Sequence, residues 1–186
     1  HPYFHGFSPS RRPDCARPRA ARKPLLNIRV HNSVSAIYGC NPMSRLLRRS
    51  HPLQILCLEE DESSRKIVDA SCQLIGAAVT FAECGPQAVK LFRTLMLDVV
   101  LLDMNLRGGD GFDVLNKIRL SGRRGYSAPV IAVTENITGL PEAAYKRLGF
   151  TGLFVKPLEP YRLIDRIDAA LIASGQTPLF MMRVSG

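Results

Sequence analysis

Several features that would identify common classes of protein are missing from this sequence of 186 residues. No apolar stretch approaches the roughly 18 residues that a membrane span needs, so no membrane partner is expected. The five cysteines include no C-x-x-C pair, which argues against a zinc site and against a disulfide framework. Arg and Pro interrupt every apolar run before Leu53, so no signal-peptide core is present. These absences predict reduced thiols and a cytoplasmic location.

The net charge of +9 is distributed unevenly along the chain. Residues 1–52 hold ten of the 25 basic residues and one of the 16 acidic ones, so the remainder of the chain is neutral. This segment is rich in Pro and Arg and lacks periodicity, which predicts a disordered N-terminal extension. A basic arm for nucleic acid or anionic lipid is the other interpretation. We favour a solvated extension without a nucleic-acid partner, because no aromatic residues for base stacking alternate with the arginines.

From Leu53 onward, short apolar runs alternate regularly with amphipathic segments. The runs predict five strands, at residues 53–58, 78–82, 98–103, 128–134 and 152–156. The segments between and after them predict five helices, at residues 63–75, 85–96, 112–120, 140–149 and 159–173. Ser63 or Ser64 is expected to cap the first helix, Met96 to face the core from the second, and Gly149 to end the fourth.

This alternation of strands and helices predicts an α/β fold, a doubly wound parallel sheet with helices on both faces. For five strands the expected order is 2-1-3-4-5, the flavodoxin-like arrangement. The domain is expected to cover residues 53–174. Residues 175–186 are expected to be a C-terminal tail, either frayed or the remnant of a longer protein.

Polar residues occur where these strands end. Glu59 and Glu60 follow the first strand, Asp103 ends the third, Thr134 ends the fourth and Lys156 follows the fifth. Ligands of open parallel sheets bind at the carboxyl ends of the strands, so these side chains are expected to converge. Clustered carboxylates repel one another unless a cation lies between them, and oxygen ligands favour Mg²⁺. A lysine and a hydroxyl beside a metal-bound aspartate can receive a phosphoryl group, which makes Asp103 a candidate nucleophile for an aspartyl phosphate.

Four motifs, in order, give the segment from Leu53 to Ala173 a resemblance to a known family. "ILCLEED", "LLDMNLRGGDG", "VIAVT" and "VKP" resemble the motifs of the receiver domain of bacterial two-component response regulators. The resemblance implies that Asp103 is the phosphoacceptor, Thr134 the switch hydroxyl and Lys156 the conserved-type lysine, followed by a proline in cis. It also implies metal ligation by Glu59, Glu60, Asp103 and the backbone carbonyl of Asn105.

The function implied by this resemblance is that of a phosphorylation switch. A sensor histidine kinase or a histidine phosphotransfer protein would donate the phosphoryl group, with Mg²⁺, or alternatively Mn²⁺, as cofactor. The phosphorylated domain would then signal by contact with a downstream protein target. It would not be an enzyme beyond its own phosphorylation, from phosphohistidine or small donors, and slow autodephosphorylation.

The sequence departs from the family pattern at several positions. The acidic pair is Glu59-Glu60, where at least one Asp is usual, and Arg107 stands where a proline is usual. Glu135 follows the switch threonine in place of a small residue, and Leu153 replaces the aromatic residue that rotates in many members. These departures support an alternative function, that of a pseudo-receiver acting as a protein-binding scaffold without efficient phosphorylation.

A third function, a phosphohydrolase of the haloacid-dehalogenase kind, is disfavoured by one residue. That chemistry needs a second aspartate two residues after the nucleophile as general acid, and Asn105 occupies the position. The sequence does not identify the kinase, the pathway or the output.

Overall fold

The apolar runs form one parallel sheet in the computed structural model, which describes residues 50–107, 111–121, 128–135 and 139–180. The strands are β1 (Gln54–Leu58), β2 (Ala78–Ala82), β3 (Val99–Asp103), β4 (Val130–Thr134) and β5 (Gly152–Val155). Their order is β2-β1-β3-β4-β5, with every neighbouring pair parallel. Every residue of β3 and β4 is buried, as expected of strands inside a sheet that is covered on both faces. The predicted fold and strand order are confirmed.

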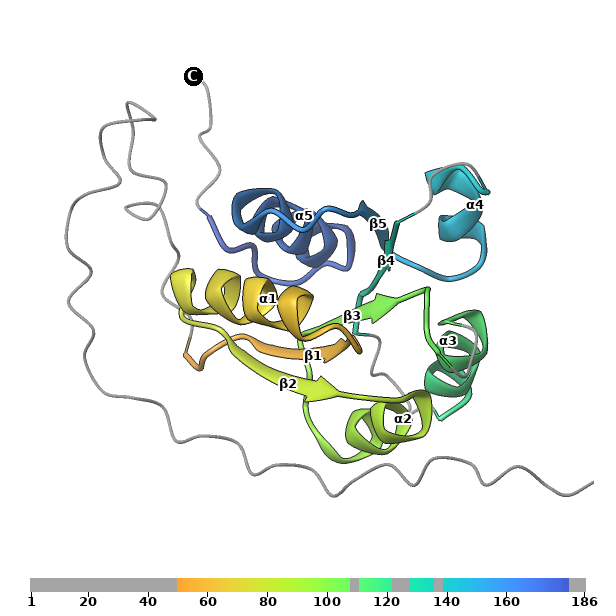
Figure 1. Cartoon of the computed structure of the whole chain (residues 1–186). Helices are drawn as coiled ribbons and strands as arrows, with labels where there is room; N and C mark the ends of the chain where they lie inside the picture. Colours follow the sequence, from red (N-terminus) through yellow and green to blue (C-terminus); the bar gives the residue numbers. More distant parts are fainter. Residues whose placement is uncertain (1–49, 108–110, 122–127, 136–138, 181–186) are drawn as a thin grey trace, which may run out of the picture.

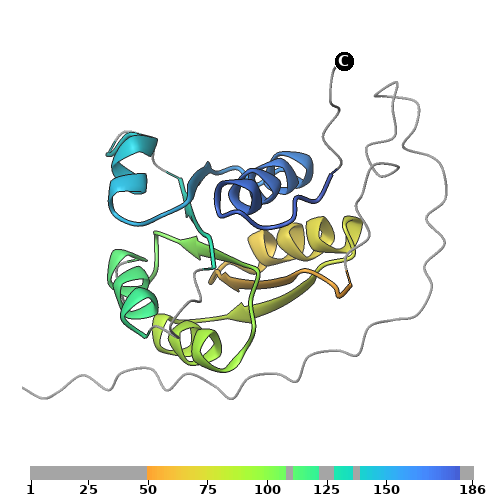
Figure 2. The same ribbon diagram turned by 180° about the vertical axis from the view of Figure 1, so that it is seen from behind.

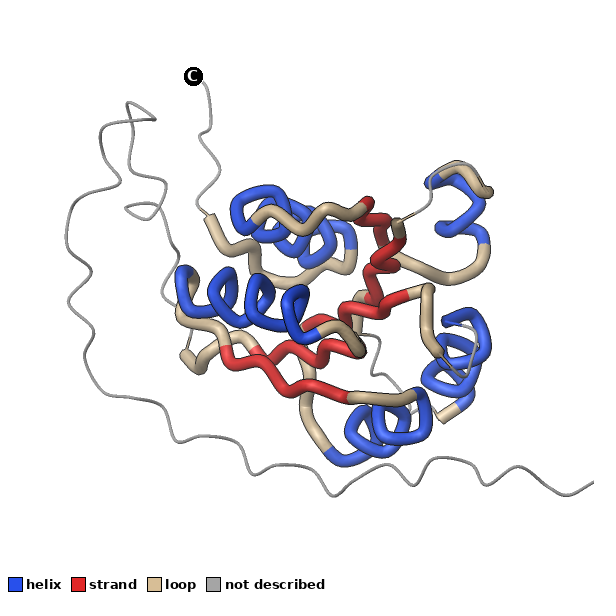
Figure 3. The backbone as a smooth tube through the Cα atoms, in the orientation of Figure 1, coloured by secondary structure: helices blue, strands red, loops and turns tan. Residues whose placement is uncertain are grey.

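Five helices connect and cover these strands in the described part of the chain. They are α1 (Glu62–Leu74), α2 (Gly85–Thr94), α3 (Gly111–Leu120), α4 (Glu142–Arg147) and α5 (Pro160–Ala173). Helices α1 and α5 lie side by side on one face of the sheet, and α2, α3 and α4 lie on the other (Figures 1 and 2). The tube in Figure 3 shows the resulting three layers, with the sheet between two layers of helices.

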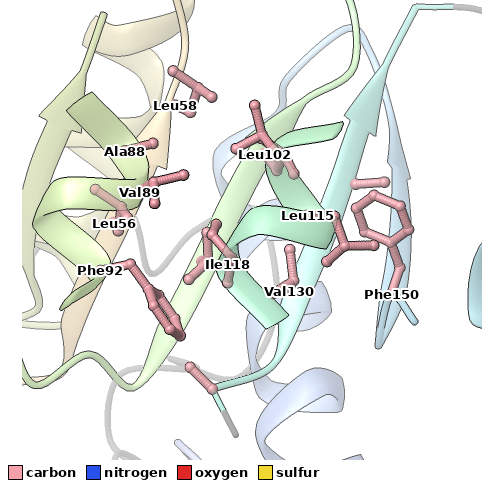
Figure 4. Close-up of a cluster of buried hydrophobic side chains, with 14 of the residues drawn as sticks. Leu56, Leu58, Ala88, Val89, Phe92, Leu102, Leu115, Ile118, Val130 and Phe150 are labelled. Atoms are coloured by element: carbon pink, nitrogen blue, oxygen red, sulfur yellow. The ribbon is translucent and has the colours of Figure 1, made fainter. Parts of the chain in front are cut away.

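Each face of the sheet has its own hydrophobic core. On one face, leucines and valines of β1, β3 and β4 pack against Phe92 of α2 and against Leu115 and Ile118 of α3 (Figure 4). On the other, Val68 and Cys72 of α1 pack with the inner side of α5. Burial of one such large apolar side chain contributes about 1.5–3 kcal/mol, so these two cores hold the strand ends in place.

Two helix boundaries differ from the prediction. Helix α1 is capped by Asp61 and not by Ser63 or Ser64, because the Asp61 carboxylate accepts a hydrogen bond from the Ser64 amide at 2.7 Å. Helix α2 ends at Thr94, so Met96 lies beyond the helical repeat and is 66% exposed instead of facing the core. Gly149 follows the end of α4 with a φ of +101°, a conformation that favours glycine, as predicted.

The segment after α5 packs against the domain as far as residue 180. Leu179 is buried and belongs to the core under α1 and α5. Its amide donates a hydrogen bond to Asp168 Oδ1 at 2.5 Å, and the Gln176 side chain donates to the carbonyl oxygen of Asp98 at 3.2 Å. The expectation of a frayed tail is therefore wrong for residues 175–180. Residues 181–186 lie outside the described residues. The same is true of residues 1–49, so the predicted disorder of the N-terminal extension stays a prediction.

The cysteines are only partly as expected. Cys57 and Cys72 are free and buried, and burial raises the pKa of both thiols, that of Cys72 to about 12. Cys84 takes part in a disulfide, so the prediction of reduced thiols is wrong at that residue. Within the described ranges, no helix has the length and apolar character needed to cross a membrane.

Candidate functional site

Three charged side chains meet at the carboxyl edge of the sheet. Lys156, just after β5, places its Nζ 2.9 Å from Glu59 Oε2 and 2.9 Å from Asp103 Oδ2. All three side chains are largely buried, with exposures of 11% for the lysine, 4% for Glu59 and 5% for Asp103. Glu59 and Asp103, which lie 97 and 53 positions before Lys156 in the sequence, are thus joined through its ammonium group.

Backbone hydrogen bonds hold these residues in register beyond the strands. The Glu59 amide donates to the carbonyl of Ala82 at 3.3 Å, and the Lys156 amide donates to the carbonyl of Thr134 at 2.8 Å. The amide of Met104, directly after Asp103, donates to the carbonyl of Val133 in β4 at 2.8 Å. The peptide bond between Lys156 and Pro157 is cis, as the family resemblance implied. The site is therefore built on the continuation of the sheet and not on a free loop.

The buried charges alter one another's proton affinity. Burial raises the pKa of Glu59, and the charge of Asp103 raises it further, while hydrogen bonds from Lys156 and the Asp61 amide oppose the rise without cancelling it. Burial alone would lower the pKa of Lys156, but its hydrogen bonds to Glu59 and Asp103 and their charges outweigh burial and raise it. Lys156 is therefore a stable cation at neutral pH. With both carboxylates ionised, this trio carries one net negative charge.

The second glutamate of the acidic pair does not join this trio. Glu60 Oε1 accepts a hydrogen bond from the Arg107 amide at 3.1 Å, and Oε2 lies 3.7 Å from Arg107 Nε. In the described part of the chain, no three His, Cys, Asp or Glu side chains are grouped so that they could hold a metal ion. Of the three carboxylates expected to cluster, the structure brings together Glu59 and Asp103 and turns Glu60 toward Arg107.

The remaining predicted residues lie close to Asp103 in the chain or in the sheet. The Asn105 amide donates to Asp103 Oδ1 at 2.8 Å, which fixes the carboxylate on the side away from Lys156. Thr134 is buried at the end of β4, one residue beyond the register partner of Asp103. Glu135 is exposed, and Leu153 is 5% exposed within the core on the α2–α3 face. A metal-binding role for the Asn105 carbonyl stays a prediction.

The donor atoms of this site suit a hard divalent cation. Mg²⁺ in proteins is usually held by one or two carboxylates together with waters and phosphate oxygens. Glu59 and Asp103 already share one cation, Lys156, and therefore face a common point. The residues present thus fit Mg²⁺ by their chemistry.

Two contacts at the site were not predicted from the sequence. The Asp61 amide donates to Glu59 Oε1 at 2.9 Å and orients that side chain. The second unpredicted contact joins Arg107 and Glu60. The sequence indicates it only by the presence of an arginine four residues after the predicted phosphoacceptor Asp103.

Comparison with known proteins identifies the family of this chain. Residues 55–168 match the family model described as the response regulator receiver domain. Among curated relatives, the probable transcriptional regulator ycf27 of Guillardia theta is 34% identical over 124 residues, which are 63% of this chain and 45% of that protein. The nitrate/nitrite response regulator protein NarP of Escherichia coli is 30% identical over 120 residues, 63% of this chain and 54% of that protein. This chain therefore spans about half the length of these relatives.

Solved structures show the same fold. The chemotaxis protein CheY4 of Vibrio cholerae superposes with a TM-score of 0.59 at 24% identity, over 65% of this chain and 100% of that one. The receiver domain of the sensor histidine kinase PA1611 of Pseudomonas aeruginosa, which has magnesium coordinated in its active site cleft, gives a TM-score of 0.57 at 24% identity, over 65% and 98% of the two chains. Since the family model matches more than half of its residues, this chain belongs to the family of response regulator receiver domains.

Proposed function

We propose that this receiver domain accepts a phosphoryl group on Asp103 and acts as a phosphorylation switch. The observation that carries the proposal is the shared contact of Lys156 with Glu59 and Asp103 at 2.9 Å. A strand end does not need two buried carboxylates and an ammonium group for folding. Buried ion pairs are seldom optimal for stability, so their presence at a ligand-binding edge favours a chemical role.

The reaction is a displacement at phosphorus. A carboxylate oxygen of Asp103 forms the new bond to phosphorus, and the bond from phosphorus to the imidazole nitrogen of a phosphohistidine breaks, with the nitrogen taking up a proton as it leaves. The Asn105 amide, 2.8 Å from Oδ1, restricts rotation of the carboxylate. Lys156 is proposed to neutralise the phosphoryl oxygens, and the Thr134 hydroxyl is proposed to hydrogen-bond one of them.

We propose Mg²⁺ as the cofactor, with Mn²⁺ as a substitute. Glu59 and Asp103 would hold the ion, and Glu60 and the backbone carbonyl of Asn105 are proposed as further ligands. When bound, the ion would offset the negative charge that gathers as phosphoryl oxygens approach two carboxylates. The magnesium in the cleft of the PA1611 receiver domain supports this proposal.

The partners follow from the proposed chemistry. The phosphoryl donor would be a sensor histidine kinase or a histidine phosphotransfer protein, and the output would be contact with a downstream protein target. We propose a cytoplasmic location, where such donors are found. No catalytic activity on a separate substrate is proposed beyond self-phosphorylation and slow autodephosphorylation.

The test is phosphorylation by acetyl phosphate with Mg²⁺, followed by intact-protein mass spectrometry. Wild type should gain one phosphoryl group, and Asp103→Asn should gain none. Asp113→Asn is the matched control, because Asp113 is an exposed acid on α3 paired with Lys117 and should leave the adduct unchanged. A full adduct on Asp103→Asn would refute the assignment of Asp103.

The alternative function is that of a pseudo-receiver, a scaffold without efficient phosphorylation. The turning of Glu60 toward Arg107 favours it, because this leaves two carboxylates instead of three facing the proposed metal. Wild type that stays unmodified by acetyl phosphate, with Mg²⁺ or Mn²⁺ in excess, would establish this alternative.

A further inference from the structure

Arg107 interacts with Glu60 through both its backbone and its side chain. Its amide donates to Oε1 at 3.1 Å, and its Nε lies 3.7 Å from Oε2. Both carboxylate oxygens of Glu60 therefore face the same residue. Because Glu60 follows β1 and Arg107 follows β3, the contact bridges two loops that border the site.

The two loops differ in how freely their side chains can move. The Glu60 side chain is 24% exposed, whereas that of Arg107 is 92% exposed. Among the residues that the structure describes, Glu60 is the ion-pair partner of this guanidinium, and a side chain so exposed can leave at small cost. The amide contact depends on the backbone and stays in place when the side chain is changed.

The contact also changes the charge that an incoming cation meets. Lys156 offsets one of the two charges of Glu59 and Asp103, and Arg107 offsets that of Glu60. With Arg107 in place, these five groups, three ionised carboxylates and two cations, sum to one negative charge. Without the arginine the same site would carry two negative charges, which attract a divalent ion more strongly.

We propose that Arg107 is a built-in competitor of the divalent cation and lowers metal affinity by keeping Glu60 engaged. The inference rests on the proposed function, since it concerns the same metal site. Metal binding then requires Glu60 to exchange the guanidinium for the ion. Arg107 is a positioning residue in this scheme, because it acts through Glu60 and not on the reacting atoms.

The expected size of the effect is modest. Exposed ion pairs contribute little, and their loss corresponds to a change of about two- to five-fold in an equilibrium constant. Arg107→Gln removes the charge and keeps the amide donor to Glu60. It should therefore bind Mn²⁺ about two- to five-fold more tightly than wild type.

Mn²⁺ titration followed by electron paramagnetic resonance of the free ion, with competition by Mg²⁺, measures this affinity without any phosphorylation. Four proteins form a double-mutant cycle: wild type, Arg107→Gln, Glu60→Gln and the double variant. Arg147→Gln, in the last turn of α4, is the matched control for loss of one exposed positive charge. We expect Arg107→Gln to tighten binding only when Glu60 is present, and Arg147→Gln to have no effect.

Each other result overturns the inference in a distinct way. If wild type binds Mn²⁺ and Arg107→Gln binds it equally well, Arg107 does not compete, and the proposed function stands. An equal gain in the Glu60→Gln background, or with Arg147→Gln, would show a general charge effect. If no variant binds Mn²⁺ at millimolar concentration, the inference fails together with the metal-dependent part of the proposed function.

Discussion

Replacing Lys156 by methionine tests the electrostatic account of the site most directly. Methionine keeps an unbranched apolar side chain in the same space and removes the ammonium that lies 2.9 Å from both Glu59 and Asp103. The two carboxylates, 4% and 5% exposed, would then face each other without their shared cation. Removing one partner of a buried ion pair costs about 3–5 kcal/mol. This trio lies at the carboxyl ends of the strands and not in the middle of the core. We therefore expect a loss at the lower end of this range, about 3 kcal/mol at neutral pH.

The loss should depend on pH in a defined direction. Burial already raises the pKa of Glu59, and without Lys156 the pKa will rise further. A carboxyl group whose folded-state pKa is raised stabilises the fold fully below its unfolded value of about 4.3, and this stability is lost as pH rises through the folded pKa. The variant should therefore lose less stability at about pH 5 than at about pH 8 relative to wild type.

Urea denaturation of wild type and Lys156→Met at both pH values is the assay. The control is Lys156→Met in an Asp103→Asn background, where one buried charge is already absent and the cost of removing the lysine should be smaller. An equal loss at the two pH values, or a larger one at the acidic value, would refute the reasoning. A loss below about 1 kcal/mol at neutral pH would equally contradict it, because that is the range of exposed pairs.

Three further predictions concern stability and thiol reactivity. Arg119→Ala should lower the free energy of unfolding by about 2 kcal/mol in urea denaturation, because the guanidinium donates to the backbone carbonyls of Ala128 and Gly149 at 3.0 and 2.8 Å. Arg119→Lys, which can replace one donor, should lose less stability. Leu179→Ala should cost about 2 kcal/mol by leaving a cavity under α5, and a melting temperature equal to that of wild type would show that the segment does not pack there. Cys57 and Cys72 should resist a thiol reagent at about pH 8 in the native protein and react in urea, because burial raises their pKa; rapid native labelling of either would contradict the burial.

The fold could be predicted in full outline because its determinants are local. Continuous apolar runs such as Val99 to Leu102 identify strands buried on both faces, and the helical repeats between them leave a parallel sheet as the solution. The boundaries were less accurate where a polar side chain decides them. Asp61 replaced Ser63 or Ser64 as the cap of α1, because all three can accept the bond and only tertiary structure selects one.

The site was predictable where it depends on the sheet and not where it depends on side-chain orientation. Glu59 and Lys156 follow β1 and β5, and Asp103 ends β3. Because these parallel strands end on the same side of the sheet, the convergence of the three residues follows from strand order. The direction of Glu60 does not follow from it, because a residue with several rotamers turns toward whichever partner another loop supplies. The burial of Leu179 likewise could not be predicted from the sequence. The segment around it is short and has no periodicity, so nothing in it shows against which element it packs.

The way the chain enters and leaves the sheet has a consequence for how this domain can be joined to other polypeptides. Strand β1 begins, and α5 ends, at the amino edge of the sheet, and Gln176 there contacts the residue just before β3. Glu59, Asp103 and Lys156 lie at the opposite edge. A tether attached before β1 or after α5 therefore starts on the side remote from Asp103. On the proposed function, a phosphoryl donor would therefore reach Asp103 unhindered whether the module is inserted into a host protein or carried at its end.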